Sequence, residues 1–275
     1  MAIIPSLPLN DGKSIPQLGL GVFLVPGDQA GPAIQAALAA GYRSIDTAAV
    51  YKNEADVGRA IKDSGLPRSQ LFITTKLWND SHAYDKALKA CNESLRKLGL
   101  DYVDLYLIHW PVPARNQYVE AWKALITLRQ AGKARSIGVS NFHIPHLQRI
   151  FAETAAVPAV NQIELHPRLQ QRELRAFNAQ HGILTESWSP LARSALLGDP
   201  VVAKVAAKHG RTPAQVLLRW HIEYGLIVIP KSVTPARIRE NAQIFEFSLD
   251  AADRAALDSL ENGSRVGPNP EVFNP

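Results

Sequence analysis

The chain has 275 residues, of which 46% are hydrophobic and 20% charged, a composition typical of an ordinary globular protein. Its 30 Lys and Arg residues against 25 Asp and Glu residues give a formal net charge of +5, which permits a polyanionic partner without requiring one. A single cysteine, Cys91, excludes an intrachain disulfide and any zinc site that needs two cysteines, and is typical of a reducing compartment.

The first residues, Met1–Pro5, lack the basic start and the long apolar run of a signal peptide. No stretch approaches the roughly 18 apolar residues that a membrane span needs. The Lys and Arg residues are dispersed and form no stripe interleaved with aromatic residues. We therefore expect a cytoplasmic protein that binds neither membrane nor nucleic acid.

Near the N-terminus, two short extended arms, Leu7–Asn10 and Ile15–Gln17, flank the dipeptide Asp11-Gly12. Asp-Gly between such arms is a strong signal for a β-hairpin. We expect this hairpin to close one end of a larger sheet.

From Leu18 onward, short apolar runs of β type alternate about eight times with longer segments of helical period. The predicted strands are Leu18–Phe23, Ser44–Asp46, Leu71–Lys76, Val103–His109, Arg135–Ser140, Val160–Glu164, Leu184–Trp188 and Leu226–Pro230. The predicted helices between them include Ala30–Ala40, Glu54–Ser64, Tyr84–Leu98, Tyr118–Ala131, Arg172–His181 and Ala214–Tyr224.

The unbroken alternation, without a linker, predicts one α/β domain over residues 1–275, a closed (β/α)8 TIM barrel. A doubly wound open sheet is the alternative. Two further helices, Val201–Lys208 and Ala251–Leu260, exceed the eight units, and residues 262–275 form a tail without period. Trp122 and Trp220 lie at helical period and are expected to pack in the core.

In such a barrel the chemistry lies at the carboxyl ends of the strands. Asp46, Lys76 and His109 end three successive predicted strands, and Tyr51 lies in the loop after Asp46. Singly, each has an ordinary explanation, such as a helix cap, a solvated strand end, a core imidazole or an amphipathic loop tyrosine. Ordinary placement would rarely bring all four to one mouth, so we interpret them as a site.

The four groups suit the delivery of a proton to a carbonyl oxygen. An ammonium beside a phenol lowers the pKa of the phenol, and a carboxylate holds that ammonium charged and in place. A histidine that donates to the same oxygen orients the substrate. Such a site needs a hydride donor. The segment Gly19–Leu24 has Leu24 where a Rossmann fingerprint has its third glycine, so any nicotinamide binds a site of another kind.

Several segments, in order along almost the whole chain, resemble the aldo-keto reductase superfamily. They are Gly41–Ala48, Tyr51 with Asn53-Glu54, Ile73–Trp78, Asp104–Pro111, Ile137–Phe142, Asn161–Pro167 and Ile229–Val233. Within the superfamily the chain is most similar to bacterial 2,5-diketo-D-gluconate reductases, notably at Thr47–Tyr51, at Leu77–Asp80 and at Trp188.

The resemblance implies a monomeric, NADPH-dependent enzyme that reduces aldehydes or ketones, 2,5-diketo-D-gluconate among the candidates. It implies Tyr51 as proton donor, Lys76 and Asp46 as its tuning pair and His109 as the orienting group. The implied cofactor residues are Ser140, Asn141 and Gln162 at the nicotinamide carboxamide, Trp188 against the ring, Ser189, Pro190 and Leu191 at the pyrophosphate, Lys231, Ser232 and Arg237 at the 2′-phosphate, and Val233, Thr234, Glu240 and Asn241 towards the adenine. The implied substrate residues are Phe23, Val50, Trp78 and Trp110.

The phosphate assignment also follows from the residues. Lys231-Ser232 leaves a strand, and Arg237 lies one turn into a helix opened by Thr234-Pro235. Two cations and a helix start then face one phosphate, which favours NADPH over NADH.

Two other functions remain as alternatives. Some members of the superfamily act chiefly as nucleotide-binding regulatory subunits of membrane channels, and a phosphate-binding isomerase or lyase can use the same barrel. The latter needs a Gly-rich phosphate loop, which residues 189–197 and 231–235 lack. No metal is expected, because His143 and His146 are interpreted as part of a helix cap.

Overall fold

The computed structural model describes residues 3–275, in which eight parallel strands form one sheet ordered β3 to β10. Their bounds are β3 Gly19–Gly21, β4 Ser44–Asp46, β5 Phe72–Leu77, β6 Val103–Ile108, β7 Ala134–Ser140, β8 Val160–Glu164, β9 Leu184–Trp188 and β10 Ile227–Val228. Parallel bridges from Leu18 to Val228 and from Gly21 to Lys231 join the first strand to the last. The sheet therefore closes into the predicted barrel, and the open-sheet alternative is excluded.

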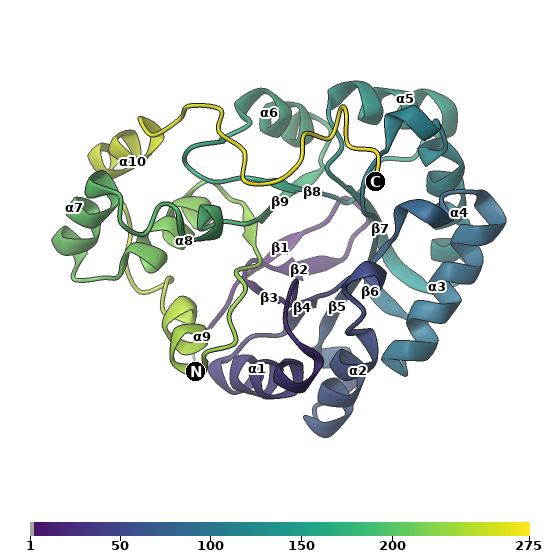
Figure 1. Cartoon of the computed structure of the whole chain (residues 1–275), viewed down its shortest axis with the longest axis horizontal. Coiled ribbons are helices and arrows are strands. Elements are labelled where there is room, and N and C mark those ends of the chain that lie inside the picture. Colours follow the sequence, from purple (N-terminus) through teal and green to yellow (C-terminus); the bar gives the residue numbers. More distant parts are fainter. Residues whose placement is uncertain (1–2) are drawn as a thin grey trace.

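Eight helices surround the strands (Figure 1). They are α1 Gly27–Ala40, α2 Glu54–Asp63, α3 Tyr84–Leu98, α4 Tyr118–Gln130, α5 Ile144–Thr154, α6 Arg172–Gln180, α8 Pro213–Glu223 and α9 Pro235–Ala242. The two predicted extra helices are confirmed as α7 Pro200–His209 and α10 Ala251–Asp258. They pack on each other, with Lys208 Nζ 2.8 Å from Asp253 Oδ1 and His209 Nε2 2.7 Å from Asp253 Oδ2.

Two local details differ from the sequence prediction. Helix α5 is not among the predicted helices, although its cap is: the His143 backbone N–H donates to His146 Nδ1 at 3.1 Å. Leu147 and Ile150 turn its apolar stripe inward, and their three-residue spacing is a signal that could have predicted the helix. The first and last strands are also shorter than predicted, because their outer residues pair only through isolated bridges.

The predicted hairpin is present as β1 Ser6–Pro8 paired with β2 Ser14–Pro16. Beside it, Leu9 and Ile15 are buried in a small apolar cluster with Leu105 and Leu107, which lie inside the barrel on β6. The hairpin therefore closes the amino-terminal end of the barrel and leaves the carboxyl end of the strands as its mouth. Trp122 and Trp220 are fully buried in the main core, as predicted.

The C-terminal tail crosses this mouth, as the yellow trace beyond α10 in Figure 1 shows. The Glu164 carboxylate, at the end of β8, accepts the backbone N–H groups of Val266 at 2.5 Å and Gly267 at 3.1 Å. Further on, the rings of Phe273 and Trp110 have their centroids 4.4 Å apart. The tail is thus part of the wall of the mouth.

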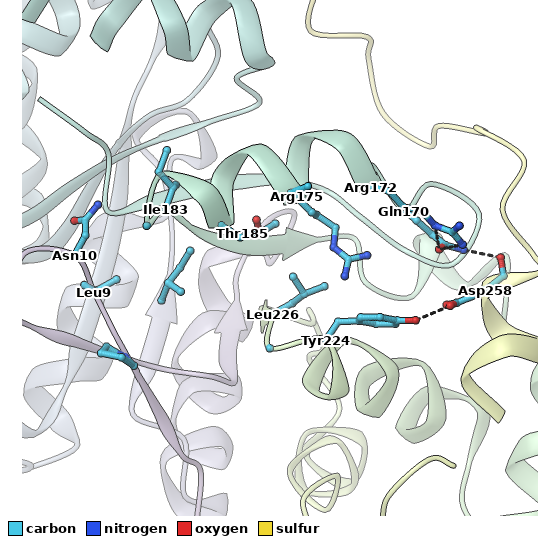
Figure 2. Close-up of a pocket in the computed structure, with 16 residues that line it drawn as sticks. Leu9, Asn10, Gln170, Arg172, Arg175, Ile183, Thr185, Tyr224, Leu226 and Asp258 are labelled. Carbon is cyan, nitrogen blue, oxygen red and sulfur yellow. Dashed lines mark hydrogen bonds between the residues drawn. The ribbon is translucent and has the colours of Figure 1, made fainter. Parts of the chain in front are cut away.

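A groove of about 900 Å³ lies on the outer side of the barrel, between α6 and α8 (Figure 2). The groove runs from Leu9 to Asp258. Inside it, the Arg175 guanidinium lies over the Tyr224 ring, 4.6 Å from the ring centroid. None of the predicted catalytic, cofactor or substrate residues lines this groove. Among residues 3–275, no helix is both long and apolar enough to cross a lipid bilayer.

Candidate active site

The structure brings the four predicted polar side chains together at the mouth. Lys76 Nζ donates to Asp46 Oδ1 at 2.6 Å and to the Thr47 carbonyl at 2.9 Å, and it lies 3.4 Å from the Tyr51 hydroxyl. The rings of Tyr51 and His109 meet edge to face, 5.7 Å between centroids. An acid, an amine, a phenol and an imidazole therefore line one space.

The loop that carries Tyr51 is pinned by a buried amide. Tyr51 ends a short 3-10 helix, η1 (Ala49–Tyr51), between β4 and α2. Asn53 accepts the Thr47 hydroxyl at 2.8 Å and donates to the Val22 carbonyl at 3.0 Å. These bonds tie the loop to the ends of two strands, so the phenol is held in place before any ligand binds.

Burial dominates the electrostatics of this group. It raises the pKa of Tyr51 above its usual value, and the nearby Lys76 ammonium offsets only part of that rise. Burial alone would lower the pKa of Lys76, but Asp46 and Tyr51 together raise it above its usual range. The expectation that the lysine brings the pKa of the phenol below its ordinary value is therefore wrong for the protein alone, and Tyr51 stays protonated at neutral pH.

His109 is a neutral imidazole at this site. Burial, with a contribution from Lys76, holds the pKa of His109 well below its usual value. Its Nδ1 is buried without a hydrogen-bond partner in the part of the chain that the structure describes. A neutral ring carries one N–H, which suits a donor to a substrate oxygen better than a proton source.

Ser140, Asn141 and Trp188 form a second connected group beside His109. The Asn141 amide donates to the His109 carbonyl at 3.0 Å and to Ser140 Oγ at 3.1 Å, and accepts the Trp188 indole N–H at 2.9 Å. Asn141 has φ +63°, a left-handed conformation that asparagine tolerates. The Trp188 indole on β9 is therefore held by a hydrogen bond to the residue that follows β7, two strands away.

Gln162 links the Asp46–Lys76–Tyr51 group to a residue that the sequence did not single out. Its Nε2 donates to Asp46 Oδ2 at 2.9 Å and to Glu186 Oε2 at 2.8 Å. Glu186 lies two residues before Trp188 on β9 and is 1% exposed. Alternation along the strand puts both side chains on the same face, a signal that could have found it.

Aromatic rings line the mouth above these groups. Phe23 lies 5.0 Å from Tyr51, Trp78 lies 5.2 Å from His109, and Trp110 lies 6.4 Å from Trp188, each measured between ring centroids. Val50, in η1, precedes Tyr51. Three predicted substrate residues thus surround the polar group, and Phe273 of the tail, which the sequence analysis did not name, joins them.

The predicted phosphate residues lie apart from the mouth, after β10 and at the start of α9. Lys231 and Arg237 are exposed, and neither forms an ion pair within residues 3–275. Ser232 Oγ accepts the Thr234 N–H at 3.1 Å, which orders the turn into the helix. Two free cations, a hydroxyl and a helix start are a donor set that fits a phosphate.

The other predicted cofactor residues differ in their exposure and in whether their polar atoms already form hydrogen bonds. Ser189, Pro190 and Leu191 follow β9, and Ser189 has φ +51°. Val233 is half-buried beside the phosphate residues. The Glu240 carboxylate is already engaged by the Thr212 hydroxyl at 2.6 Å, and Asn241 is 5% exposed.

The matching family model is that of the aldo/keto reductase family, and it covers residues 17–262. The chain belongs to this family.

Individual relatives agree. An aldo-keto reductase of Mycolicibacterium smegmatis is 56% identical over 270 residues, 98% of each chain. A protein of Yersinia pestis named methylglyoxal reductase DkgA is 55% identical over 276 residues, 99% of each chain. The crystal structure of a mutant of Gox0644 in complex with NADPH has a TM-score of 0.95 and 49% identity, covering 99% of each chain.

Proposed function

We propose that this aldo/keto reductase takes its hydride from NADPH and its proton from Tyr51 when it reduces an aldehyde or ketone to an alcohol. The observation that carries the proposal is the Asp46–Lys76–Tyr51 group beside His109 at the mouth. The 49% identical structure with bound NADPH supports the choice of cofactor.

Tyr51 and His109 divide the work on the carbonyl oxygen. His109, as a neutral ring, donates a hydrogen bond that orients the carbonyl and polarises it. Bound NADPH supplies the hydride to the carbonyl carbon. Tyr51 gives its proton to the oxygen as negative charge develops there, and Lys76 stabilises the resulting phenolate. Water then returns a proton to Tyr51.

The amide groups hold the nicotinamide end of the cofactor. Both N–H groups of the Gln162 amide point to carboxylates, so its oxygen is the atom left to accept a carboxamide N–H. Ser140 and Asn141 complete this contact, and Trp188 stacks on the ring. Ser189, Pro190 and Leu191 lie along the pyrophosphate.

Lys231, Ser232 and Arg237 bind the 2′-phosphate of the adenosine ribose, because the two cations form no ion pair among residues 3–275 and lie with the Ser232 hydroxyl beside a helix start. Val233, Thr234 and Asn241 lie towards the adenine. Glu240 supports the adenine end indirectly, because its carboxylate is bonded to the Thr212 hydroxyl.

The substrate is a small aldehyde or ketone. The aromatic rings at the mouth exclude water and favour a compact carbonyl compound. Relatives named methylglyoxal reductase make a 2-oxoaldehyde the first candidate. The similarity to 2,5-diketo-D-gluconate reductases at Trp188 and around Tyr51 makes that keto-sugar acid the second.

A panel assay tests this function. The purified chain should consume NADPH, followed by its near-ultraviolet absorbance, with methylglyoxal, simple aldehydes and 2,5-diketo-D-gluconate. A protein that binds NADPH but turns over none of them would be the nucleotide-binding regulatory subunit of the alternative. A substrate that yields product without NADPH consumption would contradict the hydride mechanism.

A further inference from the structure

The Gln162 side chain is shared between two carboxylates. One N–H of its amide reaches Asp46 Oδ2, which belongs to the lysine ion pair, and the other reaches Glu186 Oε2. The two distances, 2.9 and 2.8 Å, are those of full hydrogen bonds. This arrangement decides the orientation of the amide, because its oxygen cannot face the Asp46 carboxylate, which is paired with the Lys76 ammonium.

Glu186 differs from Asp46 in its partners. Asp46 is paired with Lys76 at 2.6 Å, whereas Glu186 forms no ion pair with any residue in 3–275. The charged and titratable groups that act on it are Asp46 on β4 and Lys76 on β5, and Glu186 itself acts on Tyr51 in η1. A buried carboxyl beside a charged carboxylate favours its neutral form.

The charge of Glu186 therefore changes with pH near neutrality. Burial first, and the Asp46 charge second, raise the pKa of the Glu186 carboxyl to about 8, although the Gln162 bond and Lys76 oppose the rise. Once ionised, Glu186 adds a second negative charge to the group around Lys76. That charge raises the pKa of Tyr51 and makes the phenol a weaker acid.

We propose that Glu186 is a positioning residue for carbonyl reduction, which sets the Gln162 amide and, by gaining or losing its own proton, sets how readily Tyr51 gives up its proton. When Glu186 is neutral, the Asp46 carboxylate alone opposes the charge of the Lys76 ammonium. When Glu186 is ionised, two carboxylates oppose it, Tyr51 gives up its proton less readily, and reduction slows. The inference rests on the proposed role of Tyr51.

The first test is a pH profile. For the wild type, kcat for reduction of a simple aldehyde should fall as the pH passes about 8. Glu186→Gln keeps an oxygen that accepts the Gln162 N–H but has no proton to lose, so the fall should move up by about one pH unit or more. Thr185→Val is the matched control. Thr185 is the adjacent residue on β9, is bonded to Asn178 at 3.0 Å and should keep the wild-type profile.

The second test separates position from charge. Glu186→Leu removes one of the two acceptors of the Gln162 amide, so the amide is held through Asp46 alone and the KM for NADPH should rise about tenfold, the loss of one hydrogen bond. Glu186→Gln should raise it much less, because the bond is retained. Circular dichroism of each variant checks that the barrel is folded.

The outcomes separate the proposed role of Glu186 from the proposed role of Tyr51. An unchanged pH profile in Glu186→Gln, or one lowered equally at every pH, would overturn the role of Glu186. Equal KM values for NADPH in the Leu and Gln variants would overturn the positioning of Gln162. Full activity of Tyr51→Phe would instead remove the proposed function on which both rest.

Discussion

Lys76 and Arg237 are both cations of the proposed site, yet they are held in opposite ways. Lys76 is fully buried and bonded to Asp46, Thr47 and Tyr51 before any ligand arrives. Arg237 is exposed and has no carboxylate partner among residues 3–275.

The difference follows from what each end must do. At the mouth, charge develops during the reaction, and donors that are already oriented need no rearrangement at that moment. A buried charge without a partner costs several kcal/mol, so the mouth must satisfy its own charges. At the phosphate end the ligand supplies the negative charge. The cations can therefore stay solvated until it binds, at little cost in free energy.

Tyr51→Phe should have the largest effect on the buried end of the site. It removes one hydroxyl from the preorganised end, so kcat should fall by about 10²- to 10⁴-fold, the usual contribution of a general acid. NADPH binding, followed by quenching of tryptophan emission, should stay near the wild-type value.

Tyr84→Phe is its control, because it also deletes a phenol hydroxyl, one bonded to Thr127 Oγ1 at 2.9 Å between α3 and α4, away from the mouth and from α9. Wild-type kcat in Tyr51→Phe, or loss of both kcat and binding, would contradict the role of the hydroxyl.

Removal of the exposed cations tests the other end. Lys231→Ala and Arg237→Ala should each raise the KM for NADPH by about 10- to 100-fold, the loss of one charge-assisted bond, and leave the KM for NADH nearly unchanged. Arg239→Ala, which removes another exposed cation of α9, is the control. A cofactor preference that survives both substitutions would mean that the phosphate is bound elsewhere.

The pH dependence of stability sharpens the account of the buried end. The pKa of Glu186 is raised to about 8 in the folded chain, so the folded state binds this proton more tightly than the unfolded state does. Its contribution to stability is full below the ordinary carboxyl range and is lost as the pH rises to about 8.

Glu186→Gln has no such proton to lose. Its Tm relative to the wild type should therefore increase between the ordinary carboxyl range and about pH 8. Glu164→Gln should show the opposite trend at lower pH, because the His166 and tail contacts lower the pKa of that carboxyl: its Tm relative to the wild type should fall as the pH rises into the ordinary carboxyl range. Parallel Tm curves for Glu186→Gln and the wild type would contradict the raised pKa.

The smallest effect is expected at the tail. Phe273→Ala removes one ring from the wall of the mouth, and an aromatic contact is worth about 0.5–1.5 kcal/mol, so the KM for an aromatic aldehyde should rise about 2- to 12-fold. The neighbouring Val272 is 77% exposed, and Val272→Ala should have no effect. Equal effects of the two changes would mean that the ring does not contact substrate.

The barrel could be predicted from the sequence, because the alternation of apolar strands and periodic helices leaves few topologies. The meeting of Asp46, Lys76 and His109 could be predicted too, since parallel strands end at one mouth. The predicted set omits helix α5, although the spacing of Leu147 and Ile150 indicates it, and extends the terminal strands beyond the residues that pair in the sheet.

The electrostatics of the mouth and the residues of its wall follow from the packing of the chain and could not be predicted from local patterns. The direction of the Tyr51 pKa depends on burial, which opposes the lysine and which spacing cannot measure. Glu186 joins the group through a hydrogen bond across 24 residues of sequence, and Phe273 reaches Trp110 from the end of an aperiodic tail. A local pattern records which face a residue takes, whereas desolvation and long-range contacts exist only once the chain is packed.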